Sequence, residues 1–285
     1  MAVAAEAPAV SPSLDEVRRL AREHNLIPLR HSFIDDCETP VSAFLKLRED
    51  GPAFLLESAD QGQRVGRYSF IGFRPREVIR WSLGDEGDPY EIAAAAVARH
   101  RQAPIPDLPP FAGGAVGVFG YDLVRTVEPL PDANPDPIGV PDMALMLTDV
   151  LVVFDHLKHT VSVLANVYAD EDVDAAYAAA HDAIADVRLR LAGPVPRPGH
   201  PPDAQRPMPE FQSNMPREAF EAMVARIVEY VHAGDAFQVV PSQRWSAASP
   251  VEAFSIYRGL RAVNPSPYMY FLDFGDFEVA GASPE

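Results

Sequence analysis

The sequence predicts an α+β fold in which antiparallel sheets are packed with helices. Strand-like runs come in pairs along the chain, as at 144–155 and 160–167, and helical segments separate the pairs. A doubly wound parallel sheet would instead alternate single strands with helices. Of the 285 residues, 47% are hydrophobic, which is enough for one large domain or two modest ones.

The first part of the chain holds most of the expected elements. Ser13 is a good N-cap with acidic residues after it, and Gly51 follows a second helical stretch. Strands are expected where apolar residues alternate or run between turn residues. The segment 128–141 carries five prolines and is expected to be an irregular loop. In order, we expect a helix at 13–23, a helix at 42–49, strands at 53–58, 67–72 and 77–83, a helix at 91–101, a strand at 112–121, strands at 144–155 and 160–167, and a helix at 170–191.

A proline-rich segment divides the chain. Seven prolines lie between 193 and 209, which predicts an extended linker. Beyond it, apolar residues from Phe220 to Val231 recur at helical spacing, and Gly234 is the expected C-cap. Strands are expected at 237–241, 243–246, 268–274 and 277–282, with a helix at 250–263. We therefore divide the chain into a flexible tail (1–13), an N-terminal domain (14–192), a linker (193–210) and the start of a second domain (211–285).

Composition excludes several classes of partner. The formal net charge of −17 repels nucleic acid and anionic membrane. No apolar stretch reaches the roughly 18–20 residues of a membrane span, and the start lacks the basic region of a signal peptide. Cys37 is the one cysteine, so no internal disulfide can form. These features predict a cytoplasmic protein that binds neither nucleic acid nor membrane.

The obvious chemical motifs are better explained by structure. The glycine run from Gly113 to Gly120 lacks the Lys-Ser/Thr of a phosphate loop, and glycines in a strand more often allow close approach of a neighbour. Asp155, His156 and His159 are expected in a hairpin turn rather than on a metal. No nucleophile with its base is recognisable, so neither catalytic nor metal-binding residues are assigned.

Two segments combine apolar and polar residues in a way that suits a small ligand. Leu55-Leu56-Glu57-Ser58 ends an apolar strand with an acid and a hydroxyl. Asn264-Pro265-Ser266-Pro267-Tyr268-Met269 begins another strand behind two stiffening prolines. Pro, Tyr and Met offer an apolar wall, and a serine could hold the charged groups of an amino acid. On composition alone, a turn followed by a core strand is the favoured interpretation of the second segment.

The same segments resemble the front of anthranilate synthase component I. The resemblance rests on Phe54–Ser58, on Asp155-His156 and on Gly281–Glu285, and it runs from about residue 14 to the end in the family's order. Four longer runs extend it, namely 66–72, 111–125, 234–244 and 264–271. The resemblance implies the two-layer sandwich of the chorismate-utilising enzymes, truncated in its second part.

In the family, the large subunit converts chorismate and ammonia to anthranilate and pyruvate with Mg2+, in tryptophan biosynthesis. A glutamine amidotransferase subunit supplies the ammonia, and tryptophan inhibits many members. By resemblance, the inhibitor site would use Ser58, Pro267, Tyr268 and Met269. The family's chorismate and magnesium ligands lie beyond residue 285, so no catalytic or metal residue is carried over.

Two alternatives stay open at this point. The large subunit of 4-amino-4-deoxychorismate synthase, a folate-pathway enzyme, shares much of the frame, although the Pro-Tyr-Met segment favours anthranilate. A non-catalytic amino-acid-binding module is the other alternative. We expect the chain to be the front portion of a larger enzyme and to be inactive alone, with unpaired strand edges and partial disorder after about residue 210.

Overall fold

The computed structural model describes residues 10–58, 66–130, 135–170, 172–196 and 208–284. Contacts divide the chain into two compact units, one of Met1–Arg197 with Ile256–Glu285 and one of Pro198–Ser255. The segment after Ile256 thus groups with the first part of the chain. The division of the chain into a tail, an N-terminal domain, a linker and the start of a second domain remains a prediction.

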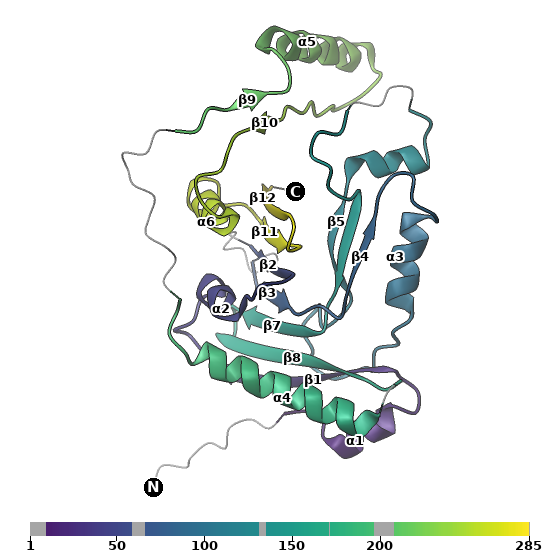
Figure 1. Cartoon of the computed structure of the whole chain (residues 1–285), viewed down its shortest axis with the longest axis vertical. Helices are drawn as coiled ribbons and strands as arrows, with labels where there is room; N and C mark the ends of the chain where they lie inside the picture. The colour runs from purple at the N-terminus through teal and green to yellow at the C-terminus, as the bar shows by residue number, and fades with distance from the viewer. Residues whose placement is uncertain (1–9, 59–65, 131–134, 171, 197–207, 285) are drawn as a thin grey trace. The chain divides into compact units, whose positions relative to one another are not determined.

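A seven-stranded sheet forms the centre of the first unit (Figure 1). Each strand lies antiparallel to its neighbours, which confirms the α+β fold class with antiparallel sheets. The spatial order is β1 (Leu26–Ile34), β8 (Thr160–Tyr168), β7 (Val150–Asp155), β3 (Tyr68–Phe73), β2 (Ala53–Glu57), β11 (Tyr268–Asp273) and β12 (Glu278–Ser283).

A smaller antiparallel sheet, in the order β4 (Glu77–Trp81), β6 (Met143–Leu147) and β5 (Ala115–Phe119), belongs to the same unit. One buried cluster joins Ala144 and Met146 of β6 to Phe54 of β2 and Leu272 of β11. The two sheets therefore share a hydrophobic core, as expected of a two-layer sandwich. Helix α3 (Pro89–Ala98) covers the small sheet, where Ile92 packs against a second cluster, and the 3-10 helix η1 (Tyr121–Thr126) follows β5.

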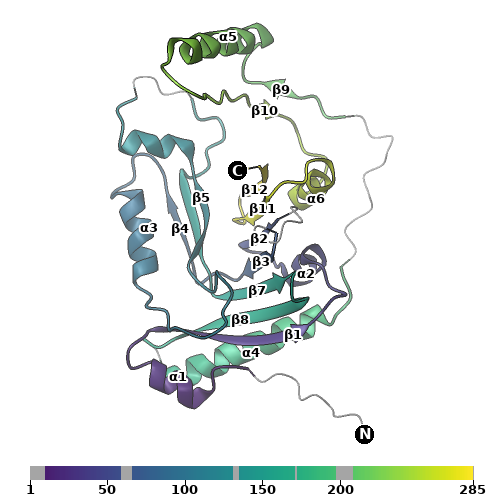
Figure 2. The ribbon, with the colours of Figure 1, turned by 180° about the vertical axis from the view of Figure 1, so that it is seen from behind.

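Helix α4 (Val173–Leu191) packs along the large sheet over β8 and β1, as both ribbon views show (Figures 1 and 2). Its sheet-facing stripe buries Ala180, Ile184, Val187 and Leu191. The short helices α1 (Leu14–Leu20) and α2 (Pro40–Leu47) pack against α4. Ser13 and Glu16 form a capping box at the start of α1, as the sequence predicts.

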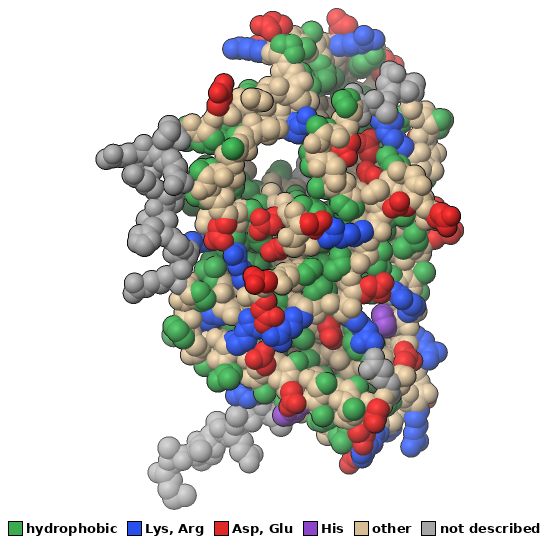
Figure 3. Space-filling view, in the orientation of Figure 1, with side chains coloured by type: hydrophobic (Ala, Val, Ile, Leu, Met, Phe, Trp, Pro, Cys, Tyr) green, Lys and Arg blue, Asp and Glu red, His purple; other side chains and the backbone are tan. Residues whose placement is uncertain are grey.

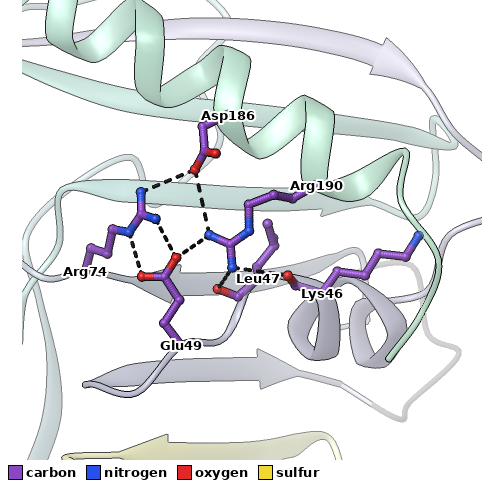
Figure 4. A network of polar contacts seen from close by, with 6 residues as sticks. All are labelled: Lys46, Leu47, Glu49, Arg74, Asp186 and Arg190. Atoms are coloured by element: carbon purple, nitrogen blue, oxygen red, sulfur yellow. Dashed lines mark hydrogen bonds and ion pairs between the residues drawn. The ribbon is translucent and has the colours of Figure 1, made fainter. Parts of the chain in front are cut away.

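A network of charged side chains links α4 to the end of α2 and to the end of β3 (Figure 4). Glu49 pairs with Arg74, and it also accepts a hydrogen bond from Arg190 at 2.6 Å. Asp186 lies 3.3 Å from Arg74 and 3.7 Å from Arg190. Arg190 also donates to the carbonyls of the last two residues of α2, at 3.1 and 2.7 Å. These bonds satisfy groups that the end of a helix leaves without intrahelical partners.

The second unit contains β9 (Gln212–Ser213), α5 (Arg217–Ala233) and β10 (Trp245–Ser246). Gly234 ends α5 in the left-handed conformation with φ 87°, which confirms the predicted cap. Helix α6 (Ala253–Val263) begins in this unit and continues into the first one. Within the part of the chain that is described, no helix is both long and apolar enough to cross a membrane.

Three strand predictions need correction. The run 144–155 is two strands rather than one, because the chain passes from β6 in the small sheet to β7 in the large sheet. The strand β1 was missed because Pro28 interrupts its pattern; as an edge strand it tolerates a residue without an N–H group. Residues 237–241 are not a strand, and of 243–246 only the last two residues pair, with β9.

The glycine run was interpreted correctly. A Cβ built on Gly117 would lie 1.9 Å from the carbonyl oxygen of Ala144 on β6. Only glycine permits this close approach of β5 to β6. Asp155 and Thr160 pair at the end of the β7–β8 hairpin, which confirms the hairpin interpretation of the segment with His156 and His159.

Candidate functional site: an apolar cavity beside β2 and β11

The two ligand-like segments of the sequence meet in the large sheet. Strand β11 pairs antiparallel with β2, so that Met269 lies opposite Glu57 and Tyr270 lies opposite Leu56. Ser58 follows directly after the last residue of β2, and Tyr268 is the first residue of β11. The sheet thus brings together segments that lie about 200 residues apart in the sequence.

A cavity of about 740 Å³ opens beside these strands within the first unit. Its volume is in the range usual for sites that bind small molecules. Aromatic and aliphatic side chains from both sheets dominate the lining, and Ser58 and the tyrosines add polar groups. The lining residues are Leu56, Glu57, Ser58, Tyr68, Phe70, Phe111, Ala115, Val116, Gly117, Val118, Phe119, Pro267, Tyr268, Met269, Tyr270, Leu272 and Val279.

The pleat of each strand explains which residues reach the cavity. Tyr68 and Phe70 alternate along β3, as do Tyr270 and Leu272 along β11, so each pair presents one face of the large sheet. On β5, all five residues from Ala115 to Phe119 line the cavity, which indicates the edge of the strand rather than one face. Since β5 pairs with β6 on one side only, its other edge offers backbone polar groups.

The four residues assigned from the sequence all line this cavity, although they do not contribute alike. Ser58 directly follows β2, and Pro267 directly precedes β11. Tyr268, the first residue of β11, is half exposed. Met269 is 1% exposed and lies opposite Glu57 in the pairing. Because side chains alternate along a strand, Met269 shares the face of Glu57 rather than that of Tyr270. Its side chain therefore supports the wall more than it forms the ligand-facing surface.

Glu57 is the acidic residue of the lining, and its carboxylate is held by α6. The Tyr257 hydroxyl donates to Glu57 Oε1 at 2.5 Å, and Arg261 lies 2.5 Å from Oε1 and 3.0 Å from Oε2. Burial, together with the neighbouring Glu57 charge, raises the pKa of Tyr257 far above its usual value. Tyr257 is therefore a hydrogen-bond donor at any physiological pH.

The polar groups at the β7–β8 hairpin have structural partners. His156 Nε2 lies 2.8 Å from Ser69 Oγ, and burial lowers the pKa of His156. Arg67 and Asp155 form an ion pair at 2.8 Å beside it. Across the described ranges, no group of three or more His, Cys, Asp or Glu side chains could hold a metal ion. Magnesium is therefore not assigned to any of these residues.

Some parts of this site were missed from the sequence. Tyr68 and Phe70 lie inside the motif 66–72, and their alternation was a usable signal for a cavity-facing pair. The β5 edge lies inside the glycine-rich motif 111–125, where nothing shows which edge is uncovered. Nothing in the sequence indicated that Tyr257 and Arg261 belong to this site. A helical pattern shows which residues share a face of the helix, but not which distant acidic residue that face will contact.

Comparison with known proteins agrees with this architecture. Residues 51–285 match the family model of chorismate binding enzymes. Anthranilate synthase component 1 of Acetivibrio thermocellus is 37% identical over 294 residues, covering 96% of this chain and 59% of that protein. The protein of the same name from Thermus thermophilus is 42% identical over 272 residues, covering 90% of this chain and 56% of its own length.

A solved structure shows the same likeness. The crystal structure of anthranilate synthase component I from Streptococcus pneumoniae TIGR4 superposes with a TM-score of 0.62 at 29% identity. The match covers 89% of this chain and 57% of that one.

The antiparallel sandwich and the extent of the family match define the class: the chain belongs to the chorismate binding enzymes. Within this class, the relatives described above are named anthranilate synthase component 1, which confirms the resemblance seen in the sequence. The chain spans less than three fifths of their length. The activity of a whole enzyme is therefore a proposal.

Proposed function

We propose that the chain is the front part of an anthranilate synthase large subunit, which converts chorismate and ammonia to anthranilate and pyruvate. The family match supports a chorismate-utilising enzyme, and the names of the relatives favour this function over 4-amino-4-deoxychorismate synthase. The ammonia would come from glutamine through an amidotransferase subunit, in keeping with "component 1" in those names. Magnesium would belong to the complete enzyme.

The cavity beside β2 and β11 is proposed as the site at which tryptophan inhibits the enzyme. The observation that carries this proposal is the pairing of β2 with β11, which puts Ser58 beside Tyr268 on one cavity. The aromatic side chains of the lining suit an indole ring. Ser58, the tyrosine hydroxyls and the β5 edge supply hydrogen-bond partners for the ammonium and carboxylate groups.

The charge of the lining argues against chorismate as the occupant of this cavity. Chorismate carries two carboxylates, and burying them without cations costs several kcal/mol or more. No Lys, Arg or His is among the described residues that line the cavity, and the guanidinium of Arg261 is already paired with Glu57. A zwitterionic amino acid with an apolar side chain suits this lining better than a dianion does.

Titration calorimetry with L-tryptophan tests the site directly. We expect the wild-type chain to bind, and Ser58→Ala to weaken binding by about 10-fold or more, since a hydrogen bond to a charged group contributes about 1.5–3 kcal/mol. Ser162→Ala is the matched control, because Ser162 bonds Ser32 on β1 at 2.8 Å, among strands that do not line the cavity. Equal affinities for wild type and Ser58→Ala would contradict the site.

An assay with chorismate and ammonia tests the enzymatic proposal. The chain alone is expected to yield no anthranilate fluorescence, because it spans less than three fifths of the length of the relatives named for this activity. A full-length enzyme that carries this sequence as its front part is expected to yield anthranilate. Formation of 4-amino-4-deoxychorismate instead would move the protein to the folate pathway.

A further inference from the structure

The structure assigns to Tyr257 and Arg261 of α6 the role of positioning residues for the cavity, which they exert through the carboxylate of Glu57. Neither residue lines the cavity. Their effect on ligand binding rests on the proposed function. Their effect on the positions of the end of β2 and the start of β11 does not.

The end of β2 needs such an anchor. The pairing of β2 with β11 ends at Glu57 and Met269, so Ser58 lies beyond the last paired residue of its strand. The position of Ser58 therefore depends on how the backbone of Glu57 is held. A carboxylate bound on both oxygens restricts the rotation of its side chain and of the backbone that carries it.

The contacts of Glu57 are suited to this task. The side chain of Glu57 is 4% exposed, and Tyr257 is fully buried. Arg261 contacts both oxygens of the carboxylate, and Tyr257 adds a third bond to Oε1. Arg261 is 39% exposed, but the carboxylate of Glu57 is buried, so loss of this partner would leave the Glu57 charge poorly compensated.

Helix α6 connects this anchor to the neighbouring strand β11. It ends at Val263, and the turn through Pro267 leads directly into β11. The ring of Tyr257 also packs against Phe271 of β11, with centroids 5.8 Å apart. The same helix thus holds β2 through Glu57 and precedes the segment that carries Pro267 and Tyr268. One charged cluster therefore holds the adjacent ends of β2 and β11 relative to each other.

Hydrogen–deuterium exchange on the 285-residue chain tests this role without any ligand. We expect Arg261→Gln and Tyr257→Phe to speed exchange by about 10-fold or more in peptides covering 53–58 and 264–271, as partly open strand ends do. Peptides covering β7 and β8 should not change. Arg258→Gln is the matched control, because Arg258 is exposed on the same helix.

A double variant separates positioning from general damage. Arg261→Gln leaves the Glu57 charge buried with its partner removed, whereas Glu57→Gln combined with Arg261→Gln leaves no charge to compensate. We expect exchange in the double variant to lie closer to wild type than in Arg261→Gln alone. Unchanged exchange in both Arg261→Gln and Tyr257→Phe, or an increase spread equally over the first unit, would overturn the assignment.

Tryptophan titration of the same variants adds the functional readout. With wild-type binding present, Tyr257→Phe and Arg261→Gln should weaken it by about 10-fold, Arg261→Lys should recover part of the loss, and Arg258→Gln should have no effect. Full affinity in Tyr257→Phe and Arg261→Gln would overturn the role in ligand binding. Absence of binding by wild type would refute the proposed site, while the exchange data would still decide the positioning role.

Discussion

Helices α4 and α5 are similar in length, with 19 and 17 residues, yet they differ completely in burial. Helix α4 is rich in alanine and buries four residues, which pack along the sheet. Helix α5 carries the clearer apolar stripe, but none of its residues is buried, and Val228 is 49% exposed. Hydrophobic side chains lie among charged ones on the visible face of α5 (Figure 3).

The difference extends to the surroundings of each helix. From Met208 to Ala253 no residue is buried, whereas seven of the nine residues of β8, on which α4 packs, are buried. An amphipathic pattern therefore provides a face that can be buried, but a partner surface is needed to bury it. Among the described residues, the first unit provides such a surface for α4, and the second unit provides none for α5.

Truncating a core side chain should separate the two helices most strongly. Ile184 on α4 is 1% exposed, so Ile184→Ala should lower the free energy of unfolding by about 2–5 kcal/mol through lost burial and a cavity. Val228→Ala on α5 should change it by less than about 0.5 kcal/mol. Urea denaturation followed by circular dichroism measures both. Similar losses in the two variants would mean that α5 is also packed against a partner surface.

Removing one arginine from each helix should give a smaller contrast. Arg190→Met breaks the bonds to Glu49 and to the carbonyls at the end of α2, and should cost about 1–3 kcal/mol of unfolding free energy. Arg217→Met removes an i,i+4 pair with Glu221, whose side chains are 85% and 59% exposed, and should cost at most about 0.5 kcal/mol. Thermal and urea unfolding of the two variants measure these losses of unfolding free energy. If Arg190→Met loses as little as Arg217→Met, the network in Figure 4 contributes little to the stability of the fold.

The smallest expected contrast is in pH dependence. Burial, and then the charges of Arg99 and Arg76, lower the pKa of His100 below its usual 6.5. The unfolded chain then binds a proton more readily than the folded chain, so this contribution to stability is complete above pH 6.5 and is lost as the pH falls below it.

The matched variants for this test are aromatic replacements. His100→Phe keeps a ring beside Tyr168, where the centroids lie 5.3 Å apart, and should make the loss of stability below pH 6.5 shallower. His232→Phe on the exposed α5 should leave the slope unchanged. Unfolding curves measured between pH 8 and 5 give the slope of the unfolding free energy against pH for each variant. Identical slopes for wild type and His100→Phe would show that His100 does not contribute to this pH dependence.

Local patterns predicted much of the architecture, because helices and strands depend first on residues near in sequence. The caps at Ser13 and Gly234 were correct, and so were the helices α4 and α5 and the paired strands β11 and β12. Residues 237–241 were predicted as a strand on the same grounds. Among the described residues they have no strand to pair with, and a strand without a partner leaves its backbone groups unsatisfied.

The sequence by itself determined the antiparallel α+β class, the family and the four candidate residues of the cavity, since these depend on local patterns and on motifs in a fixed order. Only the tertiary structure decided that β2 lies beside β11, that Met269 shares a face with Glu57, and that α6 holds the Glu57 carboxylate. The physical reason is that strand pairing, pleat and burial join residues from distant parts of the chain. A one-residue change of register would turn every side chain of a strand to the opposite face without altering any local pattern.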